Sequence, residues 1–65
     1  MRLQVNGEAR EAGDGLTVAE LLAADHEPPR HVVVEVNGDY VPRTGYGRVL
    51  RDGDRVEIIR PEFGG

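Results

Sequence analysis

Residues 16–22, with the sequence LTVAELL, decide the fold because they predict the one helix of the chain. Thr17 is placed as the N-cap, and Glu20 stands three residues later, where its carboxylate can reach back to the N–H of the cap. The apolar residues of this segment share one face at helical spacing, and the prolines at 28–29 prevent any long continuation. A helix of about two to three turns is not stable alone in water. It must therefore bury its apolar face against a sheet.

Two hairpins and a final strand surround this helix. Each hairpin is indicated by an Asn-Gly pair, at residues 6–7 and 37–38, which tolerates the positive φ values of a tight turn. The predicted strands are residues 1–5, 8–12, 31–36, 39–41 and 55–60. The strand at 8–12 is expected at or near a sheet edge, residues 43–48 are expected to form an irregular loop, and Val56 and Ile58 are expected to face inward.

The order of these elements predicts the fold class. A helix between two hairpins, covering one face of a mixed sheet of about five strands whose first and last strands pair in parallel, is the β-grasp arrangement of the α+β class. We expect one β-grasp domain over residues 1–60, followed by a flexible C-terminal tail at 61–65.

The composition excludes several functions. The 65 residues include eight arginines, no lysine, no cysteine and no serine, and carry a net charge of −4. A domain of this size buries only roughly 60% of its unfolded surface, so a self-contained enzyme with catalytic residues of its own is not expected. No metal-ligand pattern and no bound cofactor are predicted. An acidic chain without a stripe of basic residues is not expected to bind nucleic acid. The apolar runs are far too short to cross a membrane, so we expect a soluble, cytoplasmic protein.

The residues after the last strand suggest chemistry at the chain end. Five residues beyond Arg60 reach at most about 17 Å, at ~3.3–3.6 Å per residue, which is enough to enter the active site of another protein. Gly64 and Gly65 lack Cβ atoms and can pass through a narrow channel. We therefore expect the carboxylate of Gly65 to be the reacting group, with Gly64 and Phe63 entering a partner's active site. The alternative is that a Gly-Gly end arises by chance and is an ordinary frayed terminus.

Several short motifs together span nearly the whole chain: MRLQVNG at 1–7, LTVAELL at 16–22, VEVNG at 34–38 with VPR at 41–43, and DGDRVEII at 52–59 before the final Gly-Gly. In combination they resemble the ubiquitin-like bacterial sulfur carriers, in particular the ThiS-like carriers of thiamine thiazole biosynthesis. The resemblance implies that an E1-like (ThiF-like) enzyme uses ATP to adenylate Gly65. Sulfur from a cysteine desulfurase then forms a thiocarboxylate, which donates sulfur to a ThiG-like thiazole synthase.

Two other interpretations stay open. Carriers for molybdopterin, for tRNA thiolation or for specialised metabolites share the fold and the Gly-Gly end. A non-covalent β-grasp interaction module, whose Gly-Gly end is incidental, belongs to a different class. Adding one residue after Gly65 distinguishes a sulfur carrier from a binding module, because the addition abolishes carrier function and leaves a binding module untouched.

A partner surface is also expected. Val33 and Ile59 should emerge on the sheet face away from the helix, where with Phe63 they would form an apolar patch beside the chain end. Members of the resembling family often carry an acidic or aromatic residue after the Pro-Arg pair, and Tyr46 is a candidate to replace it on this surface. The alternative is that these are ordinary exposed apolar residues.

Overall fold

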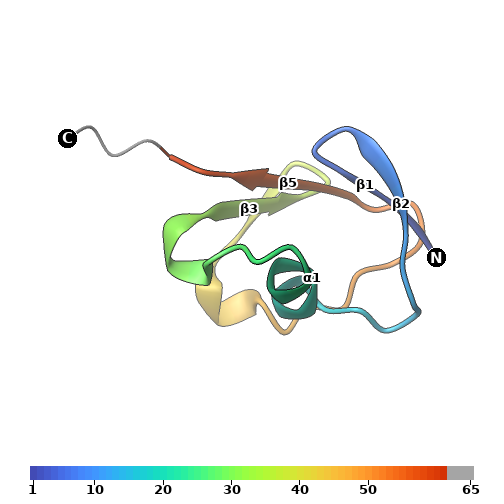
Figure 1. Ribbon diagram of the computed structural model, residues 1–65, viewed down its shortest axis with the longest axis horizontal. Coiled ribbons are helices and arrows are strands. Elements are labelled where there is room, and N and C mark those ends of the chain that lie inside the picture. The colour runs from blue at the N-terminus through green and yellow to red at the C-terminus, as the bar shows by residue number, and fades with distance from the viewer. Residues whose placement is uncertain (62–65) are drawn as a thin grey trace.

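The computed structural model describes residues 1–61, and over this range the chain forms one five-stranded sheet with one α-helix beneath it (Figure 1). Two short 3-10 helices lie in the connections. The elements are β1 (Arg2–Val5), β2 (Glu8–Glu11), α1 (Val18–Ala24), a 3-10 helix (Pro29–His31), β3 (Val33–Val36), β4 (Asp39–Val41), a second 3-10 helix (Arg43–Gly45) and β5 (Arg55–Ile59). No helix within residues 1–61 combines the length and the apolar character that crossing a bilayer requires.

The strand order confirms the predicted β-grasp fold. It is β2-β1-β5-β3-β4, so the last strand lies in the middle of the sheet and β2 lies at an edge, as expected. β5 pairs in parallel with β1, with Val5 opposite Val56, and antiparallel with β3, with Val34 opposite Ile58. β3 is shorter than predicted because residues 29–31 form a 3-10 helix that begins at a proline, where φ is already helical.

The capping box opens α1 as predicted. The Thr17 hydroxyl accepts from the Glu20 N–H at 3.1 Å, and the Glu20 carboxylate accepts from the Thr17 N–H at 2.9 Å. The Thr17 N–H and, second, the Thr17 hydroxyl, which donates to the same carboxylate oxygen at 3.0 Å, lower the pKa of Glu20. The helix ends at Ala24, before the prolines, because His26 takes the left-handed conformation at φ 56°.

One apolar core lies between α1 and the sheet. Its most deeply buried side chains are Leu3, Val18, Leu21, Leu22, Val34, Val36, Leu50 and Val56. Ile58 belongs to the same cluster, so both residues of β5 that were predicted to face inward do so.

Tyr46 also belongs to this core, which corrects the prediction that it contributes to a partner surface. Tyr46 is only 7% exposed, and burial raises the pKa of its hydroxyl. The predicted irregular loop at 43–48 instead contains a 3-10 helix, and its far end caps α1. The Ala19 N–H donates to the Tyr46 carbonyl at 2.9 Å and the Val18 N–H to the Arg48 carbonyl at 3.1 Å. These contacts satisfy two free donors of the first helical turn and draw Tyr46 inward.

Both predicted Asn-Gly turns are present, and each is also bonded to β5. Asn6 and Asn37 have φ values of 51° and 53°. The Asn6 side chain accepts from the Ile58 N–H at 2.7 Å and donates to the Ile58 carbonyl at 3.3 Å. The Asn37 side chain accepts from the Arg55 N–H at 2.9 Å. The two turns therefore hold the central strand near its end and at its beginning.

Candidate functional site

The candidate site begins where β5 leaves the sheet. β5 ends at Ile59, and Figure 1 shows it running, in red, away from the end of the molecule where the N-terminus lies. Arg60 follows, and Pro61 is half-buried. The predicted site residues Phe63, Gly64 and Gly65 lie outside the described residues, so their role stays a prediction.

An ion pair holds the last residue before Pro61. The Arg60 Nε donates to Glu27 Oε1 at 2.9 Å, and Nη2 donates to the second carboxylate oxygen of Glu27. Glu27 is only 8% exposed, and its own backbone N–H donates to the Leu22 carbonyl at 2.8 Å. The hydrogen bond from Arg60 to Glu27 raises the pKa of the guanidinium. The base of the predicted tail is thus attached to the segment that follows α1.

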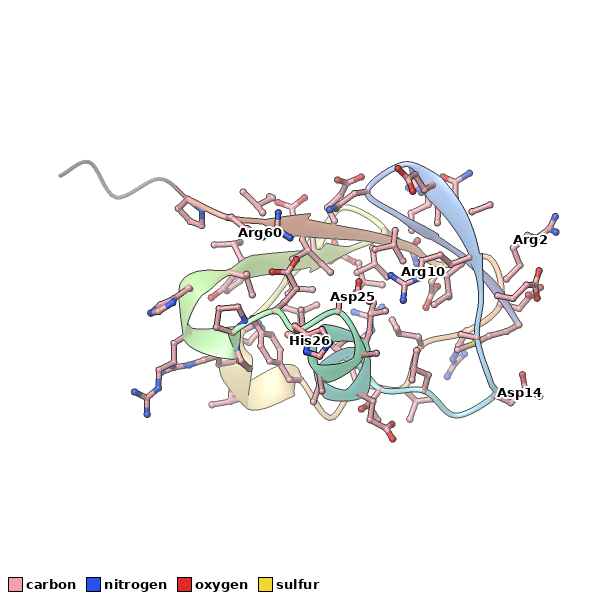
Figure 2. The ribbon with its side chains drawn as sticks, in the orientation of Figure 1. Arg2, Arg10, Asp14, Asp25, His26 and Arg60 are labelled. Atoms are coloured by element: carbon pink, nitrogen blue, oxygen red, sulfur yellow. The ribbon has the colours of Figure 1, made fainter. Side chains whose placement is uncertain are left out.

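The same segment is attached to the opposite side of the sheet by a second ion pair. Arg10 of β2 bonds both oxygens of Asp25, at 2.6 and 2.8 Å, and this contact holds the pKa of the Asp25 carboxyl below its usual range. Figure 2 shows Asp25 and His26 at the end of α1, with Arg10 and Arg60 on the strand side to either side of them. The segment 25–27 therefore bridges β2 and the end of β5.

Two of the predicted surface residues lie side by side. Val33 and Ile59 are direct partners across β3 and β5, on the face away from α1. Val33 is half-buried, whereas Ile59 is 44% exposed. Tyr40, which is 65% exposed, pairs with Glu35 on the same face and was missed by the sequence reasoning. Val33, Tyr40 and Ile59 are hereafter the open-face patch.

The sequence contained signals for what was missed. Tyr40 lies three residues after Asn37 in a predicted return strand, so hairpin register alone places it opposite Glu35. Arg60 continues the inward-facing positions of β5 after Val56 and Ile58, which indicates a partner on the helix side. Its partner Glu27 could not be identified this way, because it lies 33 positions away in a connection.

Two further features of the described residues bear on ligand binding. Among residues 1–61 no group of three His, Cys, Asp or Glu side chains is arranged to hold a metal ion. A shallow hollow exists at the beginning of β5, remote from Arg60, and it is lined by Asn37, Arg48, Val49, Arg51 and Asp54.

Solved structures of similar proteins share this fold. The crystal structure of the thiamine biosynthesis protein (ThiS) from Geobacter metallireducens superposes with a TM-score of 0.86 at 35% identity, covering 100% of both chains. The solution structure of a thiamine biosynthesis protein from the same organism superposes with a TM-score of 0.81, covering 100% of this chain and 88% of that one.

Longer relatives are also similar. A thiazole synthase of Paramagnetospirillum magneticum is 40% identical over 60 residues, which is 91% of this chain and 18% of that protein. One of Magnetococcus marinus is 36% identical over 66 residues, which is 100% of this chain and 20% of that protein. The chain thus spans about a fifth of the length of the thiazole synthases that it matches. The model of the ThiS family matches residues 3–65, and the chain belongs to the ThiS family.

Proposed function

We propose that the chain is a sulfur carrier protein of thiamine biosynthesis, acting through the C-terminal carboxylate of Gly65. The observation that carries the proposal is the match of the ThiS family model, which runs through residue 65 and so includes the Gly-Gly end. The position of β5 supports it as well, because the described chain leaves the sheet from its central strand, through Arg60 and Pro61.

The proposed chemistry takes place in partner enzymes. A carboxylate is a poor electrophile, so an E1-like (ThiF-like) enzyme attaches AMP from ATP to Gly65 and releases pyrophosphate. The terminal sulfur of a persulfide formed by a cysteine desulfurase then attacks the acyl carbon, AMP leaves, and an acyl disulfide forms. A thiol reduces this S–S bond by two electrons, which leaves the thiocarboxylate on Gly65 and a new disulfide on the thiol partner. The carrier supplies its carboxylate, a tail that includes Phe63 and Gly64, and a surface that partners recognise. It binds no cofactor itself, and its use of ATP through a partner places the reaction in the cytoplasm.

A ThiG-like thiazole synthase is the proposed acceptor of the sulfur. Two thiazole synthases contain a region similar to this chain, which supports a partnership between the two kinds of domain. The open-face patch is the proposed docking surface because Val33 and Ile59 lie beside the point where the chain leaves the sheet, and Tyr40 is exposed on the same face, on β4.

The test is the intact mass of the chain after incubation with a ThiF-like activating enzyme, Mg-ATP and sulfide. We expect an increment equal to one oxygen replaced by sulfur, localised to the C-terminal residue by fragmentation. Deletion of Gly65, and addition of one alanine after it, should each abolish the increment while leaving the far-UV circular dichroism spectrum unchanged.

No increment, with an enzyme shown to activate another carrier, would overturn the proposal and favour a non-covalent β-grasp module. If the increment forms but a thiazole synthase does not consume the thiocarboxylate, the chain serves another pathway, such as molybdopterin synthesis, tRNA thiolation or a specialised metabolite.

A further inference from the structure

We propose that the Glu27–Arg60 ion pair is a positioning device that fixes the direction in which the chain leaves the sheet. The inference rests on the proposed carrier function, because it concerns how the end of the chain is presented to an activating enzyme. Glu27 and Arg60 are positioning residues, since they act through the residues that follow them.

The location of Arg60 is the first argument. The last ladder pair of β5 joins Ile59 to Val33, and Arg60 lies one residue beyond it. Val56 and Ile58 face the core, and Arg60 continues the same side of the strand, with its side chain 67% exposed. An apolar side chain there would extend the core, whereas the arginine reaches the carboxylate of Glu27 through two hydrogen bonds. The last residue before the predicted tail is therefore attached through its side chain.

The burial of Glu27 is the second argument. The Glu27 carboxylate is 8% exposed and has lost most of its water, whereas the Arg60 side chain is 67% exposed. Desolvation of the carboxylate and solvent screening of the guanidinium both limit what the pair contributes to stability. Such a pair is a poor way to stabilise a fold, but two parallel hydrogen bonds from a planar guanidinium define an orientation closely. We therefore assign the pair a geometric role.

The rigidity of the supporting segment is the third argument. The backbone N–H of Glu27 donates to the Leu22 carbonyl of α1. Asp25, two residues earlier, is bonded to Arg10 through both oxygens. On the other side of the pair, Pro61 restricts Arg60 to extended conformations and has a fixed φ of its own. The pair thus joins a fixed segment to a stiff dipeptide.

The kinetic consequence follows from preorganisation. If only a fraction of free carriers points its chain end productively, the apparent affinity for the activating enzyme falls by that fraction. Once the end is inside the active site, the enzyme itself holds it. Loss of the pair should therefore raise KM for the carrier and leave kcat nearly unchanged.

The experiment measures pyrophosphate release by a ThiF-like activating enzyme with the carrier as the varied substrate. We expect Glu27→Gln to raise KM about fivefold to tenfold while kcat changes less than about twofold. Arg60→Lys, which keeps the charge without the paired hydrogen bonds, should give an intermediate KM. Glu27→Gln keeps one amide oxygen that can accept from Arg60, so the double variant Glu27→Gln/Arg60→Gln, which also removes the guanidinium, should raise KM at least as much as Glu27→Gln.

The ion pair of Arg10 and Asp25 provides the matched control. Asp25→Asn weakens a two-point contact on the same segment, but that contact leads to β2 rather than to the chain end. It should lower Tm and leave KM within about twofold of the native value. The ¹H–¹⁵N heteronuclear NOE of the Arg60 amide gives a readout besides activity: it should fall in Glu27→Gln and stay unchanged in Asp25→Asn.

Three results would overturn the inference. They are a Glu27→Gln KM within twofold of the native value, an equal rise of KM in Asp25→Asn, or an unchanged Arg60 NOE in Glu27→Gln. The first two leave the proposed function standing, because the native chain is still adenylated. Failure of the native chain itself to be adenylated by an active enzyme would overturn the proposed function and the inference together.

Discussion

Replacement of Asn6 by glycine should cost this domain about 2 kcal/mol, at roughly 1 kcal/mol for each of two hydrogen bonds. The Asn6 side chain bonds both backbone groups of Ile58, at 2.7 and 3.3 Å, in a partly buried position. Glycine accepts the φ of 51° without strain, so the turn itself persists. The loss therefore comes from the N–H and carbonyl of a central strand that no longer have a partner.

The assay is urea unfolding followed by far-UV circular dichroism, with a thermal melt in parallel. A loss of about 2 kcal/mol should lower Tm by roughly 8–16 °C, because 1 kcal/mol corresponds to about 4–8 °C in a domain of this size. Hydrogen exchange adds a local readout, since the Ile58 amide should be protected in the native chain and exchange rapidly in Asn6→Gly.

Asn37→Gly is the matched control, because it makes the same change in the second Asn-Gly turn at a φ of 53°. Its side-chain bonds to Arg55 and Asp54 are exposed to water, so we expect a loss of about 1 kcal/mol or less. Equal losses in the two variants, or an Ile58 amide that remains protected in Asn6→Gly, would refute the reasoning that the buried side-chain bonds carry the effect.

Three further predictions concern the helix cap, pH and docking. Thr17→Ala should destabilise the domain by about 1 kcal/mol in urea unfolding through loss of the cap, and a loss below about 0.3 kcal/mol would contradict this. Because Arg10 lowers the pKa of Asp25, this carboxyl binds fewer protons in the folded state than in the unfolded chain, so the ion pair stabilises the fold above the ordinary pKa of about 3.9 and this stabilisation is lost as pH falls through the lower folded pKa. The difference in unfolding free energy between the native chain and Asp25→Asn should therefore shrink between about pH 5 and pH 2. A difference that stays constant over this range would contradict the prediction. Ile59→Asp should weaken binding to a thiazole synthase about tenfold, as measured by calorimetry. Val49→Asp, which changes another exposed apolar side chain, should leave binding unchanged. The reverse pattern would exclude the open-face patch as the docking surface.

Local signals made most of the fold predictable. Thr17 and Glu20 specify the start of α1 within four residues of sequence, and the two Asn-Gly pairs specify the hairpins in the same way. Alternation along β5 then identifies which side chains face α1. Once two hairpins enclose one short helix, few topologies remain, and the parallel pairing of β1 with β5 follows.

Tyr46 shows why the rest was not predictable. It follows a Gly-containing segment that reads as a loop, and its burial depends on carbonyls at residues 46 and 48 meeting the N–H groups that open α1. Glu27 presents the same difficulty, because a glutamate beside two prolines reads as solvent-exposed. Its contact with Arg60, 33 residues later in the chain, forms only in the folded structure. Contacts between distant irregular segments leave no periodic trace in the sequence.

The central place of β5 also has a mechanical consequence. A force that pulls on the chain beyond Pro61 acts along the axis of β5, which is bonded to β1 on one side and to β3 on the other. The bonds to both neighbours lie across the direction of pull and share the load, so they must fail together rather than unzip one at a time. An edge strand such as β2 would peel away under far less force. Tension at this end of the domain is thus resisted by two strand pairings at once.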